Sequence, residues 1–468
     1  MGRHGHYGAA RTLWGGTDTM GRHGHYGAAR TLWGDTDTMG RHGHYGATRT
    51  LWGDTDTMGR HGHYGAARHS AFHSVLTGDM AELLKCLLRV AEKAANVARV
   101  CRQEAVLFQL LVQEKTGADK NKRFVQDFKT LADVIIQEMI RHDVGAQFPE
   151  MVGFINGEES NKFENGLGES VVVTVCPSEA ETAALLAKVL DGDSTAASLL
   201  ARAIHQDPAT EQTDTDGRHI PLQPSELGIW IDPIDATSQY IEGREEELRE
   251  GVLSPSGLHC ALVLIGVYLR CSGEPVMGVI NQPFHHKDAS GWRGQHFWGV
   301  SCDGLSLCSL PRPDSGAAPG LSAVLSSSEK PSVKSALSSL CSRLDFASGA
   351  GFKILCVIQG LADVYVLSEA STFKWDSCAP HVLLRAMGGG VVDLRKALEA
   401  GGRGQAEPSQ AELSQAEPSQ AELSQAELSY HQPNACSGAD RWANAGGLVA
   451  YRDRAQLRRV IQALRGKI

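Results

Sequence analysis

The sequence predicts a mixed α/β fold in which an α+β half precedes an α/β half. Two helical patterns within residues 81–139 come before a series of strand-like segments, as is typical of an α+β arrangement. After residue 320, short segments rich in β-branched residues alternate with helical segments, which favours an α/β arrangement. We place the boundary between the two halves at residues 315–320.

The individual elements follow from hydrophobic periodicity. A first amphipathic helix is predicted over residues 81–114, where Leu84, Leu87 and Leu88 begin an apolar stripe at helical spacing. A second helix is predicted over residues 131–139. Strands are predicted at residues 171–175, 228–231, 261–269, 277–280, 322–325, 362–367 and 447–451. Three further helices are predicted at residues 332–342, 378–387 and 455–464.

Two internal repeats flank or interrupt this pattern. A 19-residue unit fills residues 1–57 three times, begins again at Met58 and disappears after Arg68. Each unit offers one Leu, one Trp and one Tyr, which is too little apolar surface to offset chain entropy. A second repeat, QAE(P/L)S, occurs five times in residues 405–429 and is polar with two prolines. We therefore predict disorder for residues 1–79, folded halves at 80–315 and 316–468, and a flexible loop at 405–429.

The amino-acid composition limits the binding partners and the cellular compartment that we expect for this protein. Lys and Arg number 45 against 54 Asp and Glu, a net charge of −9 that argues against nucleic acid as a partner. The 11 cysteines include no C-x-x-C pair and lie in apolar stretches, which favours a reducing compartment. The longest apolar run, residues 260–269, is about half of a membrane span. No signal peptide precedes it, so we expect a cytoplasmic protein with no membrane partner.

The strongest single motif is Asp232-Pro-Ile-Asp235. An apolar strand delivers Asp232 at its carboxyl end, where α/β proteins usually bind ligands. Pro233 stiffens the turn, and Asp235 follows three residues later, so both carboxylates can face one hard cation such as Mg²⁺. An acidic turn with only a capping role explains the motif equally well.

Three more acidic motifs stand beside expected strand ends or helix starts. Glu158 and Glu159 are adjacent, although adjacent glutamates are also common on solvated faces. Asp133 follows Thr130 at capping-box spacing, so a helix cap is a sufficient explanation for it. Asp376 is either the N-cap of the following helix or a ligand held at the start of that helix. Taken singly, these motifs leave structural and metal-binding interpretations open.

Together the four motifs resemble one protein superfamily in order and spacing. They read D-x-K-T-x-x-D, G-E-E-S, W-I-D-P-I-D-A-T and K-W-D-S-C-A-P-H. This pattern is similar to the lithium-sensitive, Mg²⁺-dependent phosphatases, which include inositol monophosphatase, fructose-1,6-bisphosphatase and the 3′(2′),5′-bisphosphate nucleotidases. Further stretches are most similar to the members that act on inositol polyphosphates: residues 91–96, 264–268, 277–283, 385–390 and 440–444. The resemblance covers about residues 80–464 and includes neither repeat.

The resemblance implies a layered αβαβα sandwich and a phosphatase that requires Mg²⁺ and is inhibited by Li⁺. The implied reaction removes the 1-phosphate of inositol 1,4-bisphosphate or inositol 1,3,4-trisphosphate by attack of a metal-activated water. The implied metal ligands are Asp133, Glu158, Glu159, Asp232, the Ile234 carbonyl, Asp235 and Asp376. The implied catalytic residues, which would activate the water, are Asp133 or Glu158 together with Thr237.

The resemblance also implies a set of substrate-binding positions. Lys330 and Lys353 would hold a second, non-reacting phosphate, whereas the simpler alternative for each is a solvated surface lysine. Ala236 replaces a Ser or Gly that the family often has there, with little loss if the position acts through its backbone N–H. The full set is Asp235, Ala236, Thr237, Ser328, Lys330, Gly349, Ala350, Lys353 and Ser371.

Two other functions remain open at this stage. A nucleotidase acting on adenosine 3′,5′-bisphosphate would share every motif. The Arg-His-Gly-His sequences of the first repeat would instead suit a metal-binding or scaffolding protein. For the enzyme we expect a monomer whose first 79 residues are dispensable, because the resemblance begins at Met80 and that residue would be the original start.

Overall fold

The protein is described by a computed structural model, which divides into two units, Met1–Arg68 and His69–Ile468. The structure describes residues 67–103, 112–115, 128–165, 167–208, 220, 222–245, 251–311, 320–400 and 420–468. The 19-residue repeats and their histidines lie outside these residues, so the predictions made for them are not addressed by the structure. The same holds for residues 401–419.

The first helix differs from its predicted bounds at both ends. Helix α1 runs over Ala67–Gln103, so it begins before residue 81 and ends before residue 114. The disorder predicted for residues 1–79 is therefore wrong for residues 67–79, whereas residues 1–66 lie outside the described part of the chain. Strand β1, Val112–Glu114, instead pairs antiparallel with β2, Phe128–Thr130. Helix α3 begins at the predicted residue and spans Leu131–Gln147. It starts directly after β2 because Thr130 caps it.

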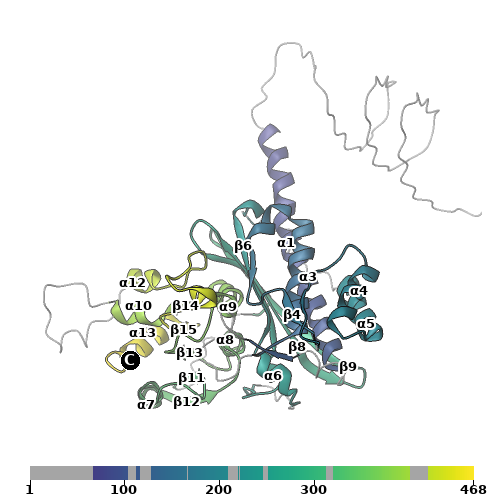
Figure 1. The fold of residues 1–468 in the computed structure, drawn as a ribbon. Coiled ribbons are helices and arrows are strands. Elements are labelled where there is room, and N and C mark those ends of the chain that lie inside the picture. Colours follow the sequence, from purple (N-terminus) through teal and green to yellow (C-terminus); the bar gives the residue numbers. More distant parts are fainter. Residues whose placement is uncertain are drawn as a thin grey trace, which may run out of the picture. The chain divides into compact units, whose positions relative to one another are not determined.

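The first sheet has six strands in the order β10-β9-β8-β7-β6-β3. All neighbours are antiparallel except β3 and β6, which run parallel. The strands are β3 Ile155–Gly157, β6 Leu227–Asp235, β7 Leu262–Leu269, β8 Pro275–Asp288, β9 Gly291–Cys302 and β10 Leu305–Cys308. In Figure 1, helices α1 and α3 lie against one face of this sheet.

Several small elements surround the first sheet. The predicted strand at 171–175 corresponds to β5, Ser170–Val172, which forms a hairpin with β4, Lys162–Glu164. Two helices that the sequence analysis did not predict, α4 and α5, pack beside this hairpin: Glu179–Val189 and Ser194–His205. The remaining elements are η1 Pro149–Phe154, η2 Pro224–Glu226, α6 Thr237–Glu242 and η3 Leu258–Cys260.

The second sheet has five strands in the order β12-β11-β13-β15-β14. Strand β11 is parallel to β12 and β13, and β15 is antiparallel to its two neighbours. The strands are β11 Leu321–Leu325, β12 Cys341–Phe346, β13 Val364–Leu367, β14 Gly390–Asp393 and β15 Leu448–Tyr451. The helices of this half are α7 Pro331–Leu340, α8 Ala350–Ile358, α9 Lys374–Ala386, α10 Leu394–Glu399, α12 Gln420–Gln425, η4 Gly438–Trp442 and α13 Arg454–Leu464.

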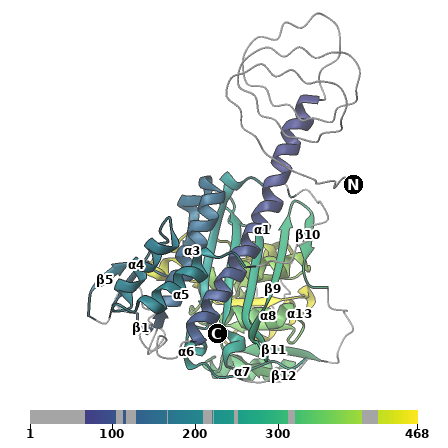
Figure 2. The ribbon, with the colours of Figure 1, turned by 90° about the vertical axis from the view of Figure 1, so that its right-hand side faces the viewer.

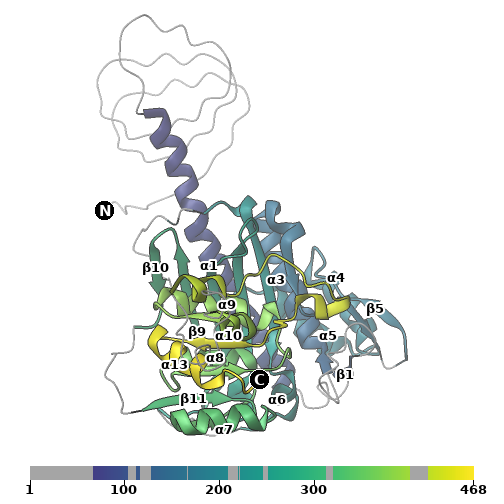
Figure 3. The ribbon, with the colours of Figure 1, turned by 90° about the vertical axis from the view of Figure 1, so that its left-hand side faces the viewer.

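Helices and sheets of the described residues form five layers, and three apolar clusters lie between them. On β7, Val263 and Ile265 face α1 and α3, whereas Leu262 and Leu264 face α8 and α9 on the other side. This alternation is what a strand buried on both faces requires. A third cluster lies under α7 and α13 on the far face of the second sheet. Figure 2 looks onto the α1–α3 layer and Figure 3 onto the α7–α13 layer. The predicted αβαβα sandwich is confirmed.

The end of the second repeat departs from the flexible loop that we predicted. Residues 405–419 lie outside the described part of the chain, but Gln420–Gln425 forms helix α12. Leu423, Ala426 and Leu428 of the last two copies are buried in the second half. The prediction is wrong for residues 420–429, because these few apolar residues find tertiary partners that sequence periodicity does not show.

Among the described residues, no helix is long and apolar enough to cross a membrane.

Candidate active site

Two adjacent parallel strands bring the first acidic residues together. Strand β3 pairs with β6 through Gly157 and Ile231, and the Glu158 N–H then donates to the Ile231 carbonyl at 3.1 Å. Glu158 and Asp232 therefore leave the sheet at the same edge. Pairing of β6 with β7 shifts register between Asp232 and Asp235, which is where Pro233 lacks an N–H. The D-P-I-D motif is a bulge that presents two carboxylates beyond the carboxyl end of β3.

The third carboxylate comes from helix α9, which lies in the layer between the two sheets. Asp376 lies in the first turn of α9 and accepts a hydrogen bond from the Phe373 N–H, so the N-cap is Phe373 and not Asp376. Carboxylate oxygens of Asp232, Asp235 and Asp376 lie within 4.8 Å of one another. The cluster thus joins the first sheet to a helix that follows the second half's strand β13.

These carboxylates are difficult to ionise without a cation. Burial and then the charges of neighbouring carboxylates raise the pKa values of Asp232 and Asp376 well above the ordinary range. Burial raises the pKa of Asp235 to about 6, although Lys353 and two backbone amides act against the shift. Oδ1 of Asp232 is buried and has no hydrogen-bond partner among the described residues.

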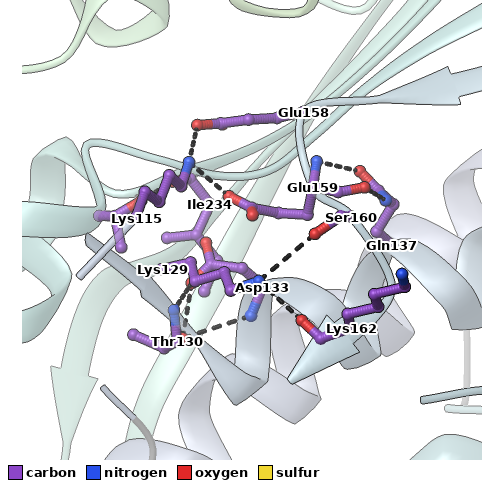
Figure 4. Close-up of polar contacts among 11 residues, drawn as sticks. Lys115, Lys129, Thr130, Asp133, Gln137, Glu158, Glu159, Ser160, Lys162 and Ile234 are labelled. Atoms are coloured by element: carbon purple, nitrogen blue, oxygen red, sulfur yellow. Dashed lines mark hydrogen bonds and ion pairs between the residues drawn. The ribbon is translucent and has the colours of Figure 1, made fainter. Parts of the chain in front are cut away.

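A lysine holds the two adjacent glutamates. Lys115 Nζ forms ion pairs with Oε1 of Glu158 and with Oε1 of Glu159, the latter at 2.6 Å (Figure 4). Gln137 on α3 fixes the Glu159 backbone, because its side-chain oxygen accepts the Glu159 N–H at 2.9 Å and its nitrogen donates to the Glu159 carbonyl. Burial raises the pKa of Glu159 to about 8 against the opposing effect of Lys115.

Asp133 has the capping geometry that its sequence spacing suggested. Its Oδ2 accepts the Thr130 N–H at 2.7 Å and the Thr130 hydroxyl at 2.6 Å, and its own N–H donates back to that hydroxyl. The same side chain lies beside Lys115 and Glu159 in Figure 4. Burial raises the pKa of Asp133 to about 7, and the Glu158 charge adds to this shift. Capping and a place at the acidic site are therefore compatible.

The turn after the D-P-I-D motif has a strained backbone, and a side-chain hydrogen bond stabilises it. Ala236 adopts a left-handed conformation with φ of 63°, which costs an L-residue roughly 1 kcal/mol. The Thr237 hydroxyl donates to the Ile234 carbonyl at 3.0 Å. Ile234 and Thr237, predicted as a ligand and a catalytic residue, are thus in direct contact.

Helix α8 closes the site from the second half. The N–H groups of Ala350 and Phe352 donate to the Asp235 carboxylate at 3.3 and 3.2 Å. A Cβ at Gly349, where φ is +77°, would lie 2.9 Å from Asp235 Oδ2, so this position requires glycine. Lys353 is buried, and its ammonium donates to the carbonyls of Ala347 and Gly349 at 3.2 and 2.6 Å.

A cavity of about 800 Å³ collects most of the predicted site. Three predicted residues do not line it: Asp133, Glu159 and Lys330. Lys330 is partly exposed and forms an ion pair with Glu369 at 3.1 Å. The predicted residues that do line the cavity are Glu158, Asp232, Ile234, Asp235, Ala236, Thr237, Ser328, Gly349, Ala350, Lys353, Ser371 and Asp376.

Sequence reasoning missed several residues of this site. Lys115 sits in a polar segment with no signal that would single it out. Glu369 lines the cavity and follows β13 directly, so a search of carboxyl strand ends would have found it. Glu329 also lines the cavity and ties its two loops, because it accepts the backbone N–H groups of Lys330 and Ser368.

The donor set fits a hard divalent cation. Mg²⁺ prefers carboxylate and carbonyl oxygens, and it usually keeps waters alongside one or two carboxylates. The buried, unpartnered Oδ1 of Asp232 supplies one such donor next to Asp235 and Asp376. The Ile234 carbonyl and Glu158 line the same cavity. We therefore regard this cluster as a candidate magnesium centre.

Comparisons with known proteins give the chain a family. Residues 79–428 match the model of the Inositol monophosphatase family. The chain is 45% identical over 405 residues to inositol polyphosphate 1-phosphatase of Homo sapiens, which covers 82% of this chain and 97% of that protein. It is 25% identical over 333 residues to 3′(2′),5′-bisphosphate nucleotidase 1 of Mus musculus, over 69% of this chain and 85% of that one.

Among solved structures, extragenic suppressor protein suhB from Bartonella henselae aligns with a TM-score of 0.44 and 14% identity. That alignment covers 83% of this chain and 100% of the other. The family match spans the sheet edge, the D-P-I-D bulge and helix α9, all of which build the acidic cluster. On the extent of this match and the identity to its human relative, the chain belongs to the inositol monophosphatase family.

Proposed function

We propose that this protein is a Mg²⁺-dependent phosphomonoesterase that removes the 1-phosphate from inositol polyphosphates. The substrates we propose are inositol 1,4-bisphosphate and inositol 1,3,4-trisphosphate. Metal dependence is a property of the family. The observation that carries the proposal is the carboxylate cluster opening into a cavity, in a chain 45% identical to a named inositol polyphosphate 1-phosphatase.

The proposed roles follow the placement of each group. Bound Mg²⁺ would neutralise the carboxylates, acidify a water molecule and stabilise the leaving oxygen. Asp232, Asp235, Asp376, Glu158 and the Ile234 carbonyl would hold the metal at the cavity, with Glu159 and Asp133 behind them.

Thr237 and Glu158 would orient and deprotonate the attacking water, with Asp133 in support. In the present geometry the Thr237 hydroxyl donates to the Ile234 carbonyl, so its oxygen remains able to accept a hydrogen bond that orients the water, and the Glu158 carboxylate would take the proton.

The rest of the cavity lining is suited to a polyhydroxylated, phosphorylated ring. Hydroxyl groups line it at Ser326, Ser327, Ser328, Ser348, Ser371 and Thr372. Lys353 uses two of its three ammonium hydrogens on backbone carbonyls, which leaves one for a phosphate oxygen. Lys330 is proposed as the second phosphate ligand, and it would have to exchange its partner Glu369 for the substrate.

Substrate comparison with the purified full-length protein tests the proposal. We expect hydrolysis of inositol 1,4-bisphosphate in Mg²⁺, none in excess EDTA, and inhibition by millimolar Li⁺. Adenosine 3′,5′-bisphosphate is the discriminating control. Faster turnover of that nucleotide would make the protein a nucleotidase, and full activity in EDTA would exclude the metal mechanism.

We further propose a cytoplasmic monomer without nucleic-acid or membrane partners. The 11 free cysteines and the net charge of −9 support this assignment. Light scattering coupled to size-exclusion chromatography would give the mass of one chain, 50.3 kDa, if the protein is monomeric.

A further inference from the structure

Helix α9 carries a row of polar residues on the side that faces away from the acidic cluster. Lys374, Ser377, His381 and Arg385 are three or four residues apart, so they share one helix face. One short segment contacts every residue of the row, although Glu274 also pairs with Arg385. We call residues 425–432, the last QAELS copy and the three residues after it, the strap.

The contacts between strap and helix run the length of this row. Lys374 Nζ donates to the carbonyls of Ser429, at 3.1 Å, and Gln432. The Tyr430 hydroxyl lies 3.0 Å from His381 Nδ1 and 3.4 Å from Ser377 Oγ. Every residue of the row therefore has a strap partner once Glu427 is included.

Glu427 forms the central contact of the strap. Its Oε1 lies 3.1 Å from His381 Nε2 and 3.6 Å from Arg385 Nε. His381 is fully buried, and burial lowers the pKa of its imidazole. A neutral imidazole donates through Nε2 to the carboxylate and accepts the Tyr430 hydroxyl at Nδ1, so both ring nitrogens are satisfied.

The strap also connects α9 to both sheets. On the side of the first sheet, the Trp230 indole donates to the Tyr430 carbonyl at 3.0 Å, and the Tyr430 N–H donates to Gly273 at 2.9 Å. On the side of the second sheet, Leu428 N–H donates to the Val391 carbonyl at 3.0 Å. The strap thus fixes α9 relative to the strand that carries Asp232 and Asp235.

The sequence difference between repeat copies explains why this copy can occupy the strap. The fourth position is Leu in copies two, four and five, and Pro in copies one and three. At Leu428 this position must donate its N–H to Val391 and bury its side chain. Proline has no N–H, so a QAEPS copy could not make this contact.

We propose that the strap is a positioning element for the metal site, and that Glu427 is its principal positioning residue. Glu427 and Tyr430 hold α9 in the orientation that places Asp376 within 4.8 Å of Asp232 and Asp235. Supporting contacts of this kind around metal ligands commonly alter metal affinity when they are removed. The inference rests on the magnesium centre of the proposed function, and it gives one copy of an otherwise unexplained repeat a specific task.

Mg²⁺ affinity of the full chain, measured by titration calorimetry without substrate, tests this inference. Glu427→Ala is expected to weaken Mg²⁺ binding about tenfold. Glu427→Gln keeps an oxygen that accepts from His381 and should remain within about threefold of the unaltered protein. Glu422→Ala changes the same position of the preceding copy and is the matched control, with affinity expected to be unchanged. Tyr430→Phe provides a second strap variant if Glu427→Ala does not fold.

Thermal midpoints in EDTA separate positioning from simple stabilisation. A lower midpoint for Glu427→Ala or Tyr430→Phe together with unchanged Mg²⁺ affinity would overturn the proposal, as would equal effects of Glu427→Ala and Glu422→Ala. Absence of Mg²⁺ binding by the unaltered protein would also overturn it. If the unaltered protein binds Mg²⁺ and the variants show the expected order, but inositol 1,4-bisphosphate is not hydrolysed, only the proposed function fails and the strap inference stands.

Discussion

The buried negative charge of the acidic site is compensated differently in two parts, at the Glu158–Glu159 pair and at Asp232. At Glu158 and Glu159 the chain supplies its own cation, the Lys115 ammonium. At Asp232 the neighbouring charges with the largest effects are those of Glu158, Asp235 and Asp376, and each raises the pKa of Asp232 further. The first part has a cation of its own that partly compensates its carboxylates, whereas Asp232 requires a proton or an added cation. The comparison indicates that a bound metal would compensate the most buried negative charge at Asp232.

Asp232→Asn should have the largest effect, because it removes the ligand that has no substitute. We expect loss of about 3 kcal/mol of transition-state stabilisation, or roughly a hundredfold in kcat. The thermal midpoint in EDTA should not fall, since the amide relieves repulsion from Asp376. Asp303→Asn changes an exposed turn and serves as the control. Retention of more than about a tenth of the activity would show that Asp232 is not a ligand.

Lys115→Met should convert the first part of the site into a copy of the second. Removing one partner of a buried ion pair is expected to destabilise the metal-free protein by about 3 kcal/mol. Because Glu158 and Glu159 then lack a cation, Mg²⁺ should raise the thermal midpoint of the variant more than that of the unaltered protein. An equal Mg²⁺-induced rise in both proteins would mean that the ammonium and the metal do not share these carboxylates.

The pH dependence of stability should sharpen the same contrast. The folded-state pKa values of Asp235, Asp133 and Glu159 are raised to about 6, 7 and 8, from 3.8, 3.8 and 4.5. The folded protein therefore binds more protons than the unfolded chain, and its stability falls as pH rises through this range. In EDTA, we expect a lower thermal midpoint at about pH 8.5 than at about pH 5.5. Excess Mg²⁺ should reduce this difference, and a midpoint that rises with pH in EDTA would contradict the prediction.

Removal of residues 1–79 should have the smallest effect. A chain of residues 80–468 keeps every residue of both parts of the site, although it shortens α1, which begins at Ala67. We expect kcat/KM within about twofold of the full chain and an unchanged Mg²⁺ requirement. A tenfold loss, measured side by side on the two purified proteins, would show that the repeats contribute to function.

The acidic motifs were predictable because each is a local signal. Asp232 and Asp235 follow a β-branched strand and flank a proline, and Asp133 stands at capping-box spacing from Thr130. Strand ends and helix starts are where folds of this class present ligands, so local signals located the acidic residues of the cavity, whereas positions such as Ser328 and Lys353 came from the family resemblance.

What escaped prediction depends on contacts between distant segments. The first helix does not extend to residue 114 as the apolar pattern suggested, because Val112–Glu114 pairs with β2. Helix α8 is buried on all sides, since it lies between two sheets, and so it lacks the solvated polar face by which a surface helix is recognised. The strap is recognisable only through His381, which lies 46 residues earlier in the chain than Glu427.

The wide separation of the proposed ligands along the chain would affect how Mg²⁺ acts on folding kinetics. Asp133, Asp232 and Asp376 come from three different layers, and they meet only after both sheets have enclosed α9. A bound Mg²⁺ ion would therefore have no assembled site in a partly folded chain and would bind the native state alone. It should leave the folding rate unchanged and slow unfolding, so that the protein's lifetime against proteolysis depends on the free Mg²⁺ concentration.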